Sequence, residues 1–272
     1  MGKIIQPITA QLEIVDRLIK QAEAAVENRP AGEDILIVAV KNNYTEWYLK
    51  QNGKGRRYMK KKEEPLARML AQAAYAKGFL KTAQMVWESL RKLQASGLQR
   101  SAACMYEALA APFEELSPAR KALVEPYVLP EKEFVPAWEN AAYEGLPFAE
   151  DDPEIFTERG VRVRSKSEKM IADKLDILGI PYRYEYPVYI RGLGIIHSDF
   201  TLLDPAERTE VVFEHFGLME DPAYLRNALR KIDLFERNGY FLGDTFLCTF
   251  ESREHVLDMK HFEQMIRERF SK

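Results

Sequence analysis

Two apolar segments that flank a short polar turn constrain the fold of this chain most strongly. Residues 195–203 (IIHSDFTLL) and 211–216 (VVFEHF) are rich in the β-branched and aromatic residues typical of strands. Residues 204–209 (DPAERT) between them have the polar side chains and the proline of a turn. The spacing predicts an antiparallel hairpin centred between Ala206 and Glu207, in which the numbers of paired residues add up to 413.

In this register two acids oppose each other across the hairpin. Asp199 is expected directly opposite Glu214, with the two Cβ atoms about 5 Å apart on one face of the sheet. A carboxylate inside an apolar strand costs several kcal/mol unless it is paired or coordinates a cation. The pattern favours a divalent metal site, and oxygen ligands without cysteine favour Mg²⁺ or Mn²⁺ over Zn²⁺. The alternative is a half-exposed strand face on which both acids meet water or a lysine.

Hydrophobic periodicity and turn residues predict a mixed α/β (α+β) chain in three parts. A mostly helical region with a small β-hairpin covers 1–125, a proline-rich linker covers 126–163, and a third part covers 164–272. In the first part we expect helices at 9–28, 63–93 (broken near Lys77-Gly78) and 101–123, with strands at 35–40, 44–49 and 57–59. In the third part we expect the order α-β-β-β-α-β-α, with elements at 165–179, 181–190, 195–203, 211–216, 221–239, 246–250 and 256–270.

Glu168 is a third acid at a position where burial of its charge would cost free energy. It shares a helix face with the apolar residues Ile171, Ala172 and Leu175. The sequence Ser165-Lys166-Ser167-Glu168 also fits a capping box, in which the glutamate bonds back to the start of the helix. A helix cap and a place in or beside a metal site are both compatible with this position.

Several motifs together resemble the PD-(D/E)XK nuclease superfamily. They are RSKSE (164–168), GIPYRYEYP (179–187), SDFT (198–201) and FEHFG (213–217), followed by a lysine-bearing helix that ends in NG (238–239). The resemblance covers about 160–272 and extends to uncharacterised bacterial proteins of this type and, more distantly, to very-short-patch repair endonucleases. The first 150 or so residues look like the N-terminal extension of the same bacterial proteins. The resemblance implies a restriction-endonuclease-like core with a central mixed sheet.

The resemblance also implies roles for single residues. Asp199 and Glu214 would hold one or two Mg²⁺ or Mn²⁺ ions, and Glu168 would be the helix acid that often joins them. The superfamily places a lysine two residues after the strand acid, but this chain has Phe216 there. Lys231 on the following helix is the candidate replacement, and its alternative is a solvated lysine beside Arg230.

Three further positions lie in or near these motifs. Ser198 replaces the proline that precedes the aspartate in the superfamily, which affects the backbone rather than the chemistry. His215 alternates to the face opposite Glu214 in a regular strand, so we expect a structural histidine or one that acts behind the metal ligands. Glu185 is a less favoured candidate to approach the site.

A basic segment in the first part is a candidate nucleic-acid contact. It contains Lys54, Arg56, Arg57, Lys60, Lys61 and Lys62. Tyr44, Trp47 and Tyr48 lie nearby in sequence and could stack on bases. The alternative is a solvated hairpin edge whose lysines prevent aggregation.

Composition and targeting signals limit the partners and the cellular compartment that the sequence predicts. The net charge of −3 requires any nucleic-acid binding to come from a local patch. No apolar run approaches the roughly 20 residues needed to span a bilayer, so we expect no membrane partner. The N-terminus lacks the apolar core and cleavage site of a signal peptide, which predicts a cytoplasmic protein. Cys104 and Cys248 lack the spacing of a zinc ligand set.

We therefore predict a Mg²⁺- or Mn²⁺-dependent nuclease that hydrolyses phosphodiester bonds, with DNA favoured over RNA as its substrate. One alternative is a non-catalytic nucleic-acid-binding module that kept the fold and lost the lysine. Another is a structural or partner-binding protein whose acids only form salt bridges.

Overall fold

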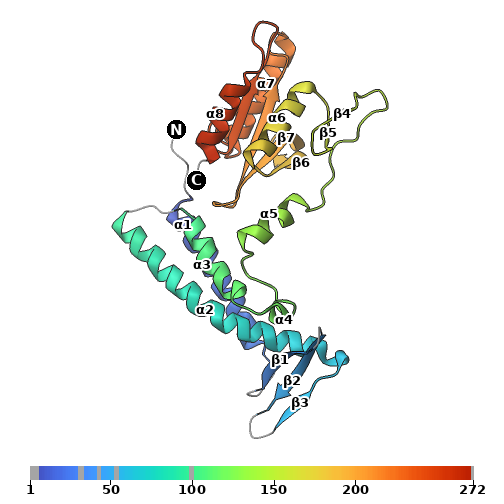
Figure 1. Ribbon diagram of the computed structural model, residues 1–272. Helices are drawn as coiled ribbons and strands as arrows, with labels where there is room; N and C mark the ends of the chain where they lie inside the picture. Colours follow the sequence, from blue (N-terminus) through green and yellow to red (C-terminus); the bar gives the residue numbers. More distant parts are fainter. Residues whose placement is uncertain (1–5, 30–33, 42–43, 52–54, 98–100, 271–272) are drawn as a thin grey trace. The chain divides into compact units, whose positions relative to one another are not determined.

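The computed structural model describes residues 6–29, 34–41, 44–51, 55–97 and 101–270. The chain divides into two compact units, and the boundary lies between Glu133 and Phe134 (Figure 1). The division falls inside the segment 126–163 that the sequence analysis assigns to a linker. In that segment lie a helix and two short paired strands, namely α5 (Glu131–Glu139), β4 (Ile155–Phe156) and β5 (Arg162–Val163).

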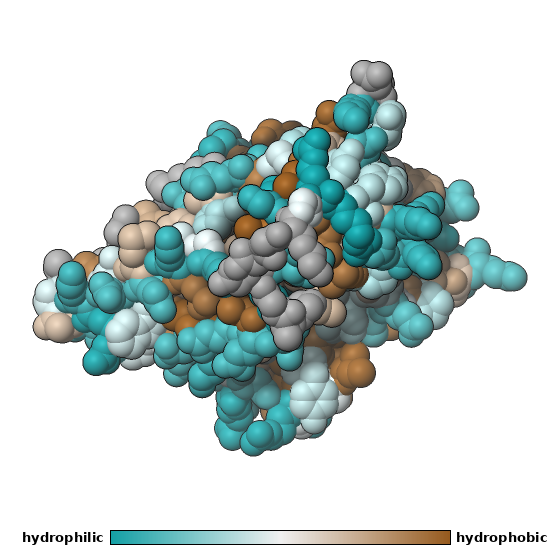
Figure 2. All heavy atoms as spheres, turned by 90° about the horizontal axis from the view of Figure 1, so that it is seen from below, coloured by the Kyte–Doolittle hydropathy of each residue, from teal (hydrophilic) through white to brown (hydrophobic). Residues whose placement is uncertain are grey.

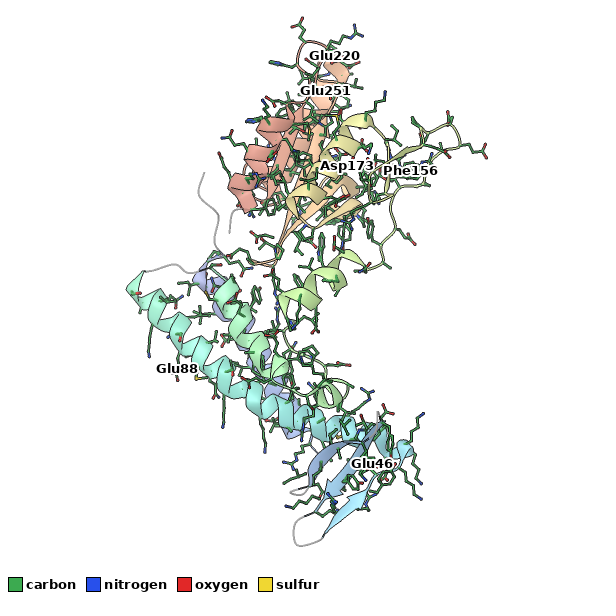
Figure 3. All side chains as sticks on the ribbon, viewed as in Figure 1. Glu46, Glu88, Phe156, Asp173, Glu220 and Glu251 are labelled. Carbon is green, nitrogen blue, oxygen red and sulfur yellow. The ribbon has the colours of Figure 1, made fainter. Side chains whose placement is uncertain are left out.

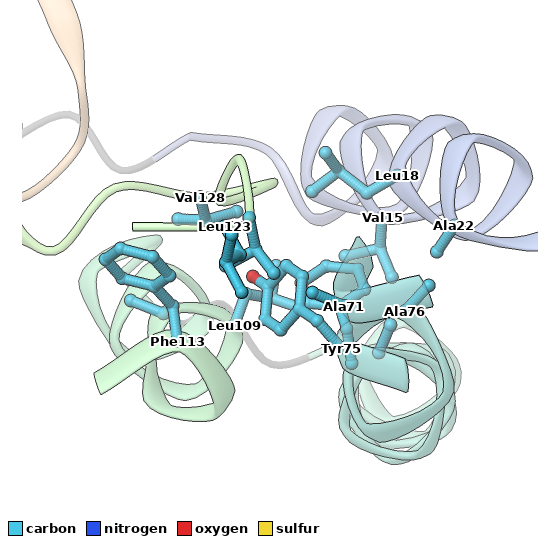
Figure 4. Packing of buried hydrophobic residues seen from close by; sticks show 14 of the residues in the cluster. Val15, Leu18, Ala22, Ala71, Tyr75, Ala76, Leu109, Phe113, Leu123 and Val128 are labelled. Carbon is cyan, nitrogen blue, oxygen red and sulfur yellow. The ribbon is translucent and has the colours of Figure 1, made fainter. Parts of the chain in front are cut away.

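Helices that pack around small residues form the core of the first unit. Its elements are α1 (Ile8–Glu27), β1 (Ile35–Lys41), β2 (Tyr44–Lys50), β3 (Arg56–Tyr58), the 3-10 helix η1 (Lys61–Glu63), α2 (Glu64–Ser96), α3 (Ala103–Glu114) and α4 (Pro118–Lys121). Alanines such as Ala71 and Ala76 let the helices approach closely, and Tyr75 fills the space beside them (Figure 4). The ring of Tyr75 stacks on that of Tyr127 with centroids 5.4 Å apart.

Two helix predictions in this unit are wrong in their boundaries. α2 continues through Gly78 without a break, because Ala76 and Phe79 on either side are fully buried. Burial of this kind outweighs the roughly 1 kcal/mol that a glycine costs inside a helix. The helix expected over 101–123 is divided instead, since Ser117 precedes Pro118 and has an extended backbone.

The strands of the first unit form an antiparallel sheet in the order β1-β2-β3, as the sequence pattern indicates. Leu36 of β1 and Leu49 of β2 are buried in the helical core, together with Met59 just after β3. Successive side chains of a strand point to opposite faces. The sheet therefore has one face on the core and one face that is open.

The second unit has the element order predicted for its sequence, α-β-β-β-α-β-α. Its elements are α6 (Lys166–Leu178), β6 (Tyr182–Ile190), β7 (Gly194–Asp204), β8 (Thr209–Phe216), α7 (Pro222–Arg237), β9 (Phe246–Phe250) and α8 (Met259–Phe270). The four strands form one mixed sheet in the order β6-β7-β8-β9, in which β8 and β9 are parallel and the other neighbours are antiparallel. Val212 and Phe216 of β8 pack toward α7, whereas Val211 and Phe213 pack toward α6 and α8.

The hairpin of β7 and β8 has the predicted register. Phe200 pairs with Phe213 and Asp204 with Thr209, so that each pair adds up to 413. Arg208 in the turn has a φ of 50°, and the Asp204 carboxylate accepts a hydrogen bond from the Glu207 amide. The turn residues therefore close the hairpin at the expected place. Among the residues that are described, no helix is long and apolar enough to cross a membrane.

Candidate functional site

The acids Asp199 and Glu214 lie where β7 and β8 stop pairing. The ladder between these strands ends at Phe200 and Phe213, one residue before the two acids. At the next position the Asp199 carboxylate accepts a hydrogen bond from the His215 amide, at 2.6 Å between Oδ2 and N. β8 meanwhile remains paired with β9 as far as Phe216. The Asp199 side chain thus replaces the backbone hydrogen bond between β7 and β8 at this point. It keeps Asp199 close to Glu214, which precedes His215.

Lys231 reaches this place from the helix that covers the sheet. It lies on α7, and its Nζ is 2.7 Å from Oε1 of Glu214. The contact is an ion pair between the ammonium and the buried carboxyl group. The side chain of Glu214 is 3% exposed and that of Lys231 is 27% exposed. Lys231 therefore contacts Glu214 and is not a fully solvated lysine.

Burial changes the protonation of both acids. Burial raises the pKa of Glu214 to about 8, the negative charge of Asp199 adds to this rise, and Lys231 opposes it. Burial also raises the pKa of Asp199 to about 6, against the hydrogen bond from His215 and the charge of Lys231. A buried carboxyl group whose pKa is raised by a neighbouring carboxylate favours a retained proton or a nearby cation. This is the electrostatic setting that a positively charged ligand would relieve.

Glu168 is occupied as a helix cap. Ser165 is the N-cap of α6, and its hydroxyl accepts a hydrogen bond from the Glu168 amide at 3.1 Å. One carboxylate oxygen of Glu168 accepts from the Ser165 hydroxyl, and the other accepts from the Arg164 amide and the Tyr184 hydroxyl. Glu168 therefore forms the predicted cap. Its charge acts on Asp199 and Glu214 at longer range and raises the pKa of each.

Glu185 lies level with Asp199 on the neighbouring strand but faces an arginine. The pairs on either side, Tyr184 with Phe200 and Tyr186 with Ser198, place it opposite Asp199. Its φ of 50° departs from strand geometry. Its carboxylate forms a two-point contact with Arg164, at 2.6 Å to Nε and 3.2 Å to Nη2. Its charge still raises the pKa of Asp199.

His215 belongs to a polar network at the carboxyl ends of the parallel strands. Its Nδ1 lies 2.9 Å from Oγ1 of Thr249, and its Nε2 lies 3.2 Å from Oε2 of Glu251. The same Glu251 oxygen accepts a hydrogen bond from Ser167 at the start of α6. Figure 3 labels Glu251 directly after β9. Burial lowers the pKa of His215, and Glu251 opposes this.

Sequence reasoning overlooked Glu251, although a signal was present. The residue directly follows a buried strand, and parallel neighbouring strands end at the same edge of a sheet. This rule could have placed an acid after β9 beside the residues at the end of β8. The expectation that His215 is structural agrees with this network.

The position that the superfamily gives to lysine is part of the apolar core. Phe216 is 3% exposed, and its ring stacks on that of Phe250 with centroids 5.7 Å apart. A lysine there would place its charged group among Val212, Phe235 and Phe246. The site instead receives its ammonium from Lys231, whose side chain is partly exposed.

The two strand acids fit a Mg²⁺-type cation better than a closed metal cage. Within the described ranges, no group of three or more His, Cys, Asp or Glu side chains is arranged to hold a metal ion. Mg²⁺, however, is commonly held by one or two carboxylates, with water and substrate phosphates as its other ligands. Asp199 and Glu214 are hard oxygen donors of raised pKa, and Oε1 of Glu214 already contacts the cationic Lys231 Nζ. This donor set suits the cation expected from the sequence.

The basic side chains of residues 54–62 do not all lie on one face of the first sheet. Arg56 and Arg57 are neighbours in β3 and so lie on opposite faces of the first sheet. Arg57 is paired with Glu63, at 2.9 Å. Lys60, Lys61 and Lys62 are exposed around the start of η1, and Lys54 lies outside the described residues.

Comparison of the chain with protein-family models, with curated proteins and with solved structures finds no match.

Proposed function

We propose that the second unit hydrolyses phosphodiester bonds of nucleic acid with the help of a divalent cation, as a member of the PD-(D/E)XK superfamily with a restriction-endonuclease-like fold. The proposal rests mainly on the ion pair of Lys231 with Glu214, beside Asp199. These three residues occupy the positions that the sequence resemblance assigns to the strand acids and the migrated lysine. The element order and the mixed sheet support the same proposal.

Each residue has a distinct task under this proposal. Asp199 and Glu214 would hold Mg²⁺ or Mn²⁺, which when bound supplies Lewis-acid activation of the phosphate and of water. The His215 amide fixes one Asp199 oxygen and so orients that carboxylate. The Lys231 ammonium would stabilise the negative charge that develops on the phosphate during attack. Glu168 keeps the start of α6 in place beside the acids.

Substitution of Asp199 tests the proposal. The protein with Mg²⁺ or Mn²⁺ should nick plasmid DNA and cut labelled single-stranded DNA or RNA, leaving 5′-phosphate ends. Asp199→Asn should reduce cleavage by at least about a hundredfold and weaken Mn²⁺ binding measured by calorimetry. Asp233→Asn is the matched control, because this carboxylate is exposed on α7 and pairs with Arg237. Equal cleavage by Asp199→Asn and wild-type protein would exclude a catalytic role for this site.

The same ion pair also supports a second candidate function. A lysine that already neutralises Glu214 can stand in for a cation in a protein that binds nucleic acid without cutting it. Lys231→Met separates the two candidates. A nuclease should lose about 100- to 1000-fold in cleavage rate while still binding Mn²⁺. A binding module should show no cleavage in any form and should bind an oligonucleotide equally well with chelator present.

A further inference from the structure

The open face of the first sheet gathers tyrosines and basic side chains. We define the tyrosine face as Tyr44, Tyr48, Lys50, Arg56 and Tyr58. Tyr48 pairs directly with Tyr58, and Lys50 pairs directly with Arg56. Residues that are directly opposed, or two apart in one strand, share a face. These five side chains therefore lie on the side away from the buried Leu49.

Two of the three tyrosine rings of this face are exposed, and the half-buried ring of Tyr48 is held in place by its neighbours. Tyr44 and Tyr58 are each 56% exposed. The rings of Tyr48 and Tyr58 meet edge to face, with centroids 5.8 Å apart, and the Arg56 guanidinium lies 5.1 Å from the Tyr48 ring centroid. The Tyr48 hydroxyl donates a hydrogen bond to Glu46, which Figure 3 labels on this sheet. Rings fixed in this way lose little freedom when a flat ligand stacks on them.

The charge around this face differs in sign from that of the whole chain. Residues 34–64 contain eight Lys or Arg and four Asp or Glu, whereas the whole chain contains 39 and 42. Three of the four acids are already paired, Glu46 with Lys41, Glu63 with Arg57 and Glu64 with Arg68. Figure 2, seen from below Figure 1, shows hydrophilic side chains interspersed with smaller hydrophobic patches. A ligand for such a face combines negative charge with flat apolar surfaces.

We propose that the tyrosine face binds a single strand of nucleic acid, with bases stacked on Tyr48 and Tyr58 and phosphates near Lys50 and Arg56. A single strand exposes the faces of its bases, whereas a duplex buries them in its own stack. The choice of nucleic acid rests on the function proposed above. The proposal adds that the protein engages unpaired strands, and it assigns this task to the first unit. Trp47, which the sequence analysis grouped with the tyrosines, belongs to the core side instead.

Fluorescence anisotropy in chelator tests the binding without any contribution from cleavage. The probes are a labelled 15-residue dT strand, the corresponding rU strand and a DNA duplex of equal length. The single strands should bind more tightly than the duplex, and the dT and rU arms identify the preferred sugar. The double variant Tyr48→Ala/Tyr58→Ala should bind the preferred strand at least about tenfold more weakly. Tyr48→Phe/Tyr58→Phe is the matched control, because it keeps both rings, and it should bind like wild type.

The basic residues give a second test that leaves the rings intact. Each lost phosphate contact on a single strand reduces the slope of log K against log salt by about 0.7. Arg56→Gln should therefore lower the slope by about 0.7, and Lys50→Gln/Arg56→Gln by about twice as much. Lys77→Gln should leave the salt slope unchanged, because Lys77 is an exposed residue in the middle of α2, away from the tyrosine face.

Three results would overturn the inference. They are equal affinity for duplex and single strand, equal affinity of the double alanine and double phenylalanine variants, and equal binding of a labelled polyglutamate peptide. Circular dichroism of each variant checks its fold, and the Lys50→Gln/Arg56→Gln variant decides the matter if the alanine variant unfolds. Binding of the single strand is measured in chelator and so does not depend on cleavage. Failure of the cleavage proposal and failure of this inference are therefore distinguishable.

Discussion

Glu214 illustrates how strongly a buried position changes a carboxyl group. Loss of water favours its neutral form, and the negative charge of Asp199 acts in the same direction. The Lys231 ammonium only partly compensates. An acid whose pKa is higher in the folded than in the unfolded state stabilises the fold at low pH and loses this contribution as the pH rises.

The stability of the metal-free protein should therefore fall as the pH rises from about 4.5 to about 8. Glu214 has a folded pKa of about 8 against an ordinary value of 4.5, which corresponds to at most on the order of 5 kcal/mol. Asp199 contributes in the same direction between its ordinary 3.8 and about 6. Urea unfolding in chelator between pH 5 and pH 9 measures this slope. Glu214→Gln should make the free energy of unfolding less dependent on pH, whereas the control Asp233→Asn should leave this dependence as in wild type. An unchanged slope in Glu214→Gln would contradict its assignment to Glu214.

At the scale of single elements, local signals predicted more than long-range ones. The register of β7 and β8 followed from two strand patterns and one turn, all within 22 consecutive residues from Ile195 to Phe216. The capping box at Ser165 is equally local. The continuity of α2 through Gly78 was missed, because it depends on packing against other helices. Burial can override a local preference that is worth only about 1 kcal/mol.

In the candidate site too, contacts within one hairpin could be predicted, whereas contacts between elements far apart in the chain could not. Asp199 and Glu214 come together through one hairpin, so their proximity could be predicted. Lys231 could be proposed only because the resemblance allows a lysine to come from the next helix. Nothing in the sequence indicated that Arg164 would hold Glu185. Contacts between elements far apart in the chain depend on how the helices cover the sheet.

Ser165→Ala tests whether Glu168 serves α6 alone or the cation site as well. Loss of an N-cap side chain should lower the free energy of unfolding by about 1 kcal/mol, measured by urea denaturation. Mn²⁺ binding should remain unchanged, because Asp199 and Glu214 lie on strands. Ser165→Thr keeps a capping hydroxyl and should behave like wild type. Loss of Mn²⁺ binding in Ser165→Ala would place Glu168 among the groups that hold the cation.

At the scale of the whole molecule, each unit has its own hydrophobic core. The buried cluster of the first unit runs from Ile8 to Val128, and the two clusters of the second run from Val163 to Ile266. The second unit also includes the end of α5, which precedes the sheet in sequence. There the Trp138 indole donates a hydrogen bond to Glu210 at 2.7 Å, and the Arg183 guanidinium lies over its ring. Units of about 130 residues with separate cores are large enough to fold alone.

Separation of the chain just before α5 should therefore give two folded proteins. Fragments 1–129 and 130–272 should each show a cooperative thermal transition by circular dichroism. Fragment 130–272 should keep Mn²⁺-dependent cleavage, and fragment 1–129 should keep binding of single strands. A fragment without a cooperative transition would show that its core depends on the other unit.

The ion pair between Lys231 and Glu214 has a consequence for the order of events in the life of the protein. The Lys231 ammonium lies against Glu214, and the pKa of that carboxyl group is raised to about 8, so the second unit does not need a bound cation to avoid an unpaired buried charge. Synthesis and folding can then finish first, and cation loading can follow as a separate step. Under the function proposed here, the availability of Mg²⁺ or Mn²⁺ would control when the protein acts, without controlling whether it is folded.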